Sequence, residues 1–70
     1  MLRYALPEAE TVQLSVYDVM GREVAVLVDQ RQEPGRKQVR LDASQLSSGT
    51  YFYRLQAGEK TKTERLTVVR

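Results

Sequence analysis

The stretch Val12–Val24, which reads VQLSVYDVMGREV, decides the fold. Valine and leucine alternate with polar residues as far as Tyr17, and a period of two is typical of a half-buried β-strand. Asp18 and Gly21, which follow, belong to the residue types that tight turns favour. The valines that resume after Gly21 therefore predict a second strand, antiparallel to the first.

The same alternation recurs in shorter segments on both sides of this stretch. Glycine-containing turns separate them, and Gly21 and Gly35 are the clearest turn glycines because each precedes a strand-like run. Six short strands, or seven if Leu46 joins one, predict an all-β fold, an immunoglobulin-like antiparallel β-sandwich. Val24–Val28 is apolar on both faces, which predicts a central strand, and Asp42–Leu46 predicts one helical turn capped by Asp42.

The inward-facing positions of these strands give a predicted core. It consists of the alternating apolar side chains Leu6, Val12, Leu14, Val16, Val24, Leu27, Val39, Leu41, Leu46, Tyr51, Tyr53, Leu55, Leu66 and Val68.

Charge is unevenly distributed although the total is nearly balanced. The 70 residues carry 11 basic and 9 acidic side chains, a net charge of +2, which does not point to nucleic acid. Residues 1–35 have three basic against six acidic side chains, whereas residues 36–70 have eight against three. We interpret this as two solvated sheet faces that attract each other, with a basic docking strip near the C-terminus as the alternative. No apolar run approaches the length of a signal peptide or a membrane span, so we predict no membrane insertion.

The residue types needed for catalysis or metal binding are scarce. The chain has no histidine to activate its serines and neither cysteine nor histidine to bind zinc. Asp18, Asp29 and Asp42 are candidate calcium ligands, but aspartate at a strand end more often bonds turn amides. We therefore predict a protein that is not an enzyme and that has no cofactor.

Exposed aromatic rings leave a different function open. Tyr17 and Phe52 are expected on the faces of their strands that point away from the core. Rings in such positions can stack on sugars, so a carbohydrate-binding or structural accessory module of a secreted polysaccharide-degrading enzyme is the alternative hypothesis.

Taken in order, the strands and turns resemble a known family. The matching motifs are the opening Leu2–Glu8, then Val12-x-Leu14-x-Val16-Tyr17-Asp18-x-x-Gly21-Arg22-Glu23-Val24-x-x-Leu27, and finally Leu46-x-x-Gly49-x-Tyr51-x-Tyr53-x-Leu55. This pattern is similar to the C-terminal sorting domain of type IX secretion cargo proteins in Bacteroidetes. It also resembles the immunoglobulin-like domain of the flagellar hook-capping protein.

The resemblance implies a sorting signal that directs a cargo protein to the cell surface or the medium. The implied route runs through the periplasm and the outer membrane, and the implied partners are the outer-membrane type IX translocon and a sortase-like peptidase. By position, the residues expected to carry translocon recognition are Leu46, Gly49, Tyr51, Arg65, Leu66, Val68 and Arg70. Residues 1–70 are expected to form a single sorting domain truncated at its N-terminal edge. The sheet edge so exposed is expected to allow a homodimer.

Overall fold

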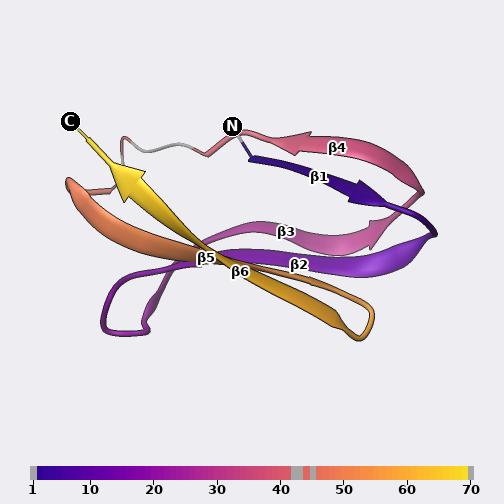
Figure 1. The fold of residues 1–70 in the computed structure, drawn as a ribbon, viewed down its shortest axis with the longest axis horizontal. Coiled ribbons are helices and arrows are strands. Elements are labelled where there is room, and N and C mark those ends of the chain that lie inside the picture. The colour runs from indigo at the N-terminus through magenta and orange to yellow at the C-terminus, as the bar shows by residue number, and fades with distance from the viewer. Residues whose placement is uncertain (1, 42–43, 45, 70) are drawn as a thin grey trace.

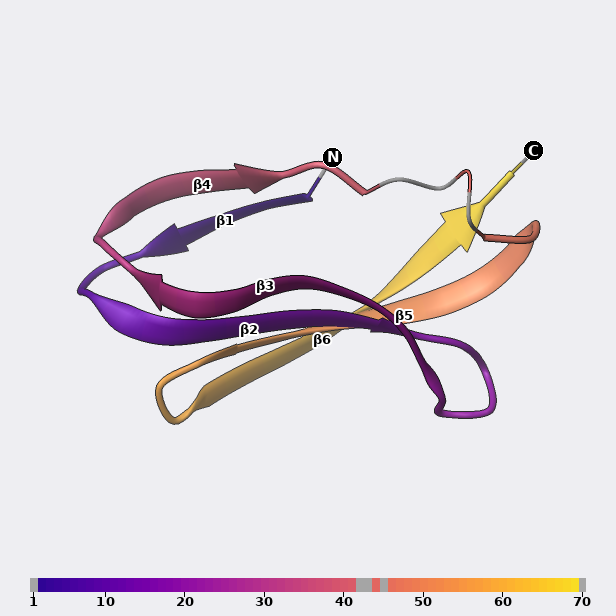
Figure 2. The same ribbon diagram turned by 180° about the vertical axis from the view of Figure 1, so that it is seen from behind.

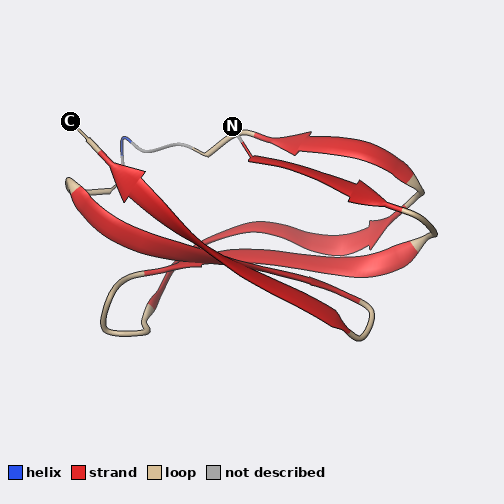
Figure 3. Cartoon of the chain, in the orientation of Figure 1, coloured by secondary structure: helices blue, strands red, loops and turns tan. Residues whose placement is uncertain are grey.

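The described residues form six antiparallel strands (Figure 1). The computed structural model describes residues 2–41, 44 and 46–69. The strands are β1 (Leu2–Leu6), β2 (Glu10–Tyr17), β3 (Glu23–Gln32), β4 (Gly35–Val39), β5 (Gly49–Ala57) and β6 (Lys60–Val68). Strands joined by short loops dominate the described chain (Figure 3). Six strands were predicted, and the helical turn predicted at 42–46 falls on residues 42, 43 and 45, which lie outside the described residues.

The strands form two sheets of unequal size. β1 pairs with β4 in a two-stranded sheet, and the order β3-β2-β5-β6 forms a four-stranded sheet. Figure 2 shows the small sheet above β2 and β3. The C-terminal end of β6 extends beyond the small sheet. The sandwich-like, all-β fold predicted from the alternation is therefore confirmed.

β2 is the centre of the hydrophobic core. Its inward side chains Val12, Leu14 and Val16 are 0–1% exposed. Two clusters of buried residues meet along this strand. One contains Leu6, Val12, Leu14, Val28 and Ala57, and the other contains Val16, Leu46, Tyr51 and Val68.

The prediction of a central strand over residues 24–28 is wrong. β3 is an edge strand, and its register with β2 shifts twice, between Leu14 and Ser15 and between Val16 and Tyr17. Because side chains alternate between faces, each bulge moves the following residues to the opposite face. Val28 thus faces the core opposite Leu14, whereas Val26 lies opposite Ser15 and is 57% exposed.

The bulges account for the errors in the predicted core at Val24 and Val28, whereas Ala57 continues the regular inward alternation of β5 and was left out of the prediction. Val24 is 40% exposed, and Val28 and Ala57 are buried although neither was predicted. The other predicted residues are buried or pack against the clusters as partly buried side chains, namely Leu6, Val12, Leu14, Val16, Leu27, Val39, Leu41, Leu46, Tyr51, Tyr53, Leu55, Leu66 and Val68.

The turn between β2 and β3 is built around Asp18. Its carboxylate accepts the backbone N–H groups of Met20 (2.9 Å) and Arg22 (3.0 Å), and the Nε of Arg22 at 2.9 Å. Gly21 has φ +82°, a value that side chains disfavour, and its N–H donates to the Asp18 carbonyl oxygen. Gly35, the second predicted turn glycine, has φ +130° where β4 begins. Asp18 thus bonds turn amides, as predicted.

Candidate functional site

The structure gathers the sequence-predicted recognition residues at one end of the large sheet. β5 begins there and β6 ends there, so that Gly49 lies opposite Val68 and Tyr51 lies opposite Leu66. Arg65 lies opposite Phe52 in the same ladder. Arg70 lies outside the described residues.

Most of these side chains point into the molecule. Leu46, Tyr51 and Val68 are 6–9% exposed, and Leu66 packs beside them as a partly buried side chain. The Tyr51 hydroxyl donates to the Ser47 carbonyl oxygen at 2.8 Å, which ties the segment before β5 to that strand. These residues therefore determine the position of the β6 end and offer little surface to a partner.

A smaller set of side chains is exposed at this end. Arg65 and Thr67 are exposed, and they belong to the face of the sheet opposite Val68 because successive strand residues alternate. Val69 is 86% exposed. Sequence reasoning missed Val69, although an apolar residue directly after the core-facing Val68 is a detectable signal of an exposed apolar side chain.

β6 also has an unpaired edge. It pairs with β5 over nine residues without a register shift, and no other strand of the described residues pairs with it. The opposite edge of the large sheet, β3, carries the two bulges, which disrupt a regular ladder. Of these two edges, β6 is therefore the better template for an additional strand.

The first half of β6 is polar on its inner side. Lys62 lies opposite Leu55 and Glu64 lies opposite Tyr53, and the two charged groups approach within 3.6 Å. Both side chains are substantially exposed, so this ion pair adds little stability. Inward charges on an edge strand do oppose uncontrolled strand pairing.

Tyr4 and Asp18 have shifted pKa values, and both side chains make contacts that stabilise the fold. Burial raises the pKa of Tyr4, whose hydroxyl donates to the Gln32 side-chain oxygen and so links β1 to β3. The pKa of Asp18 is lowered, chiefly because the carboxylate accepts the backbone N–H of Arg22. Both groups have structural partners, and neither belongs to the predicted recognition residues.

Metal-binding and membrane-spanning features are not found in the described residues. In that part of the chain, no cluster of His, Cys, Asp or Glu is suited to hold a metal ion. No helix within the same residues has the length and apolar character needed to cross a membrane.

Tyr17 and Phe52 are cross-strand partners on β2 and β5. Both side chains are half-buried rather than free to present a full ring face.

Fold and surface together define a small β-sandwich module whose accessible features are turns, a regular strand edge and exposed side chains beside it. A family model of secretion-system C-terminal sorting domains matches residues 2–69. The chain belongs to this family, and its function is that of the type IX sorting signal of a cargo protein. No curated protein and no solved structure gave a significant match.

Membership of this family has three consequences. The domain is recognised by the secretion machinery, and it accompanies export to the cell surface or the medium. The family consists of sorting signals rather than enzymes. Nothing in the comparison supports the carbohydrate-binding alternative.

Proposed function

We propose that the outer-membrane type IX translocon recognises this domain by binding to β6. The unpaired, regular edge of β6 is the observation that carries this proposal. A partner strand that adds to this edge gains main-chain hydrogen bonds along up to nine residues. Arg65, Thr67 and Val69 lie on and just after the same strand and provide side-chain specificity, with Arg70 as the predicted terminal contact.

The buried members of the predicted set act indirectly. Leu46, Tyr51, Leu66 and Val68 fix the end of β6 through the second core cluster, and Gly49 pairs with Val68. Loss of one of these side chains would displace the strand that the translocon binds. We expect such substitutions to impair export together with stability.

The domain acts on a cargo that has already reached the periplasm. Docking then commits the cargo to cross the outer membrane, and a sortase-like peptidase removes the domain from it. In this sequence of events the domain is a ligand and a substrate, and it contributes no catalytic group.

We propose that the homodimer, which was expected through the N-terminal sheet edge, forms through the β6 edge. Two antiparallel β6 strands centred on Thr63 place each Lys62 opposite the Glu64 of the other copy, which is favourable cross-strand pairing. The homodimer and the translocon-bound form are then mutually exclusive. Light scattering tests this dimer, and a molecular mass that stays monomeric at every concentration contradicts it.

Export of a fused reporter tests the recognition proposal. The chain is placed at the C-terminus of a periplasm-directed reporter in a bacterium with a type IX system. Arg65→Glu should reduce the exported fraction several-fold and leave the reporter in the periplasm. Arg54→Glu is the matched control, because Arg54 is also exposed and lies on the neighbouring strand β5.

Two results would decide against this role of β6. One is unchanged export of Arg65→Glu, and the other is an equal loss of export in the Arg54→Glu control. Circular dichroism of both purified variants checks that they remain folded.

A further inference from the structure

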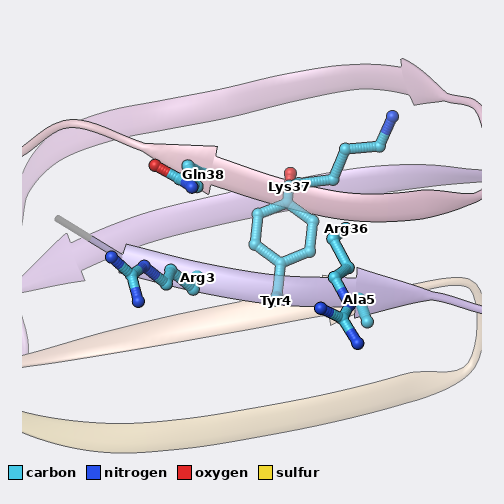
Figure 4. Close-up of a pocket in the computed structure, with 6 residues that line it drawn as sticks. All are labelled: Arg3, Tyr4, Ala5, Arg36, Lys37 and Gln38. Atoms are coloured by element: carbon cyan, nitrogen blue, oxygen red, sulfur yellow. The ribbon is translucent and has the colours of Figure 1, made fainter.

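The small sheet carries a basic hollow on its surface, away from β6. The hollow has a volume of about 460 Å³ and is lined by Arg3, Tyr4, Ala5, Arg36, Lys37 and Gln38 (Figure 4). Three of these residues are cationic and none is acidic. None of the three cations forms an ion pair with a described residue.

The two arginines converge on β1. Arg3 belongs to β1, and Arg36 belongs to β4, where it lies opposite Ala5. Figure 4 shows the Arg36 side chain reaching across to Ala5, so that both guanidinium groups lie beside β1. The small side chain of Ala5 leaves the space that this crossing requires.

β1 offers backbone groups next to these charges. It pairs with β4 on one side, and within the part of the chain that the structure describes no strand pairs with its other edge. Tyr4 holds β1 in place over the large sheet through its hydrogen bond to Gln32. The edge is therefore a fixed row of donors and acceptors with two guanidinium groups beside it.

We propose that β1 binds an extended acidic peptide segment of a partner protein by strand addition. Arg3 and Arg36 stand two register positions apart, and carboxylates at positions i and i+2 of a strand are separated by a matching distance of about 7 Å. Each guanidinium can donate two parallel N–H hydrogen bonds to one carboxylate, which makes a bidentate pair. The backbone ladder favours a peptide over a phosphate-bearing or sulfated polymer, which cannot pair with a sheet edge. This surface lies on the other sheet from β6, so the inference does not depend on the recognition role proposed above.

Calorimetric titration of the 70-residue chain with synthetic peptides tests the inference. The probe is a heptapeptide with both ends blocked and the sequence TEVEVET, and the comparison peptide is TQVQVQT. We expect measurable binding of the glutamate peptide that weakens with salt, and at least tenfold weaker binding of the glutamine peptide.

Charge-reversed variants locate the binding surface. Arg3→Glu combined with Arg36→Glu should weaken binding of the glutamate peptide at least tenfold. Arg31→Glu combined with Arg54→Glu is the control, since it changes the net charge equally through exposed arginines of the large sheet, and it should change affinity less than about threefold. Arg3→Gln combined with Arg36→Gln gives a milder test if charge reversal disturbs folding.

Four outcomes would overturn the inference. The first is absence of binding by the glutamate peptide, and the second is equal loss in both charge-reversed variants. The third is undiminished binding of both of two peptides that are N-methylated at the even or at the odd positions, because one of the two lacks the N–H groups that face β1 and cannot form the ladder. The fourth is binding of inorganic polyphosphate, but not of the peptide, that depends on Arg3 and Arg36.

Discussion

At the scale of single residues, Asp18 shows how this chain uses its few functional groups. Its carboxylate accepts two backbone N–H groups and the Arg22 guanidinium in the turn between β2 and β3. The spacing of Asp18 and Gly21 allowed this turn to be predicted, because each residue type has a local reason to be there. The partners of Asp18 lie within four residues, so no tertiary information was needed.

The lowered pKa of Asp18 predicts a pH-dependent contribution to stability. Because the folded-state pKa lies below the usual value of 3.8, the ionised carboxylate stabilises the fold above that pH. The stabilisation is lost as the pH falls through the folded-state pKa. Asp18→Asn should therefore unfold at a lower urea concentration than the wild type at pH 7, and the difference should shrink at about pH 2.

Urea unfolding at both pH values measures this effect. Asp29→Asn is the control, because Asp29 is exposed and its contact with Gln13 is long, at 3.5 Å. A difference between wild type and Asp18→Asn that is the same at both pH values would show that the charge of Asp18 does not contribute.

At the scale of elements, β2 and β3 show what the sequence can and cannot predict. The strict alternation of β2 predicted its end at Tyr17 and its buried face, because one face must enter the core. In β3 five consecutive apolar residues fit either register, so their pattern contained no signal for the bulges. Pairing with β2 decided which valines are buried, and this pairing is a tertiary property.

Isosteric substitutions in β3 test the assignment of its two faces. Val28→Thr places a hydroxyl in the core and should lower the free energy of unfolding by about 2 kcal/mol. Val26→Thr places the same group on the exposed face and should change it by less than about 0.5 kcal/mol. Urea denaturation of both variants measures the difference. Equal costs, or a larger cost for Val26→Thr, would contradict the observed bulges.

At the scale of the whole molecule, the sandwich is asymmetric, and this asymmetry determines which surfaces are available. The small sheet covers β2 and β3, whereas β6 has a regular edge and an end that extends beyond it (Figure 2). The excess of basic residues in the second half of the chain is divided between the two sheets, with Arg36 and Lys37 on β4 and Lys62 and Arg65 on β6.

The sequence was sufficient to predict the fold class and the family. The predicted core and the predicted recognition set overlap, and the sequence alone did not resolve this conflict. Leu46, Tyr51 and Val68 belong to both sets, whereas Arg65 belongs to the recognition set alone, and the burial of the first three residues shows that they face the core. The free edge of β6 likewise depends on which strands are neighbours.

Photo-crosslinking in cells tests most directly whether β6 is the surface that the secretion machinery reads. A photoreactive amino acid replaces either Thr67 on β6 or Val26 on β3 in the reporter fusion, and both positions are exposed. We expect crosslinks to the outer-membrane translocon from position 67 and not from position 26. Crosslinks from position 26 alone, or equally from both positions, would contradict the proposal that β6 is the recognised strand.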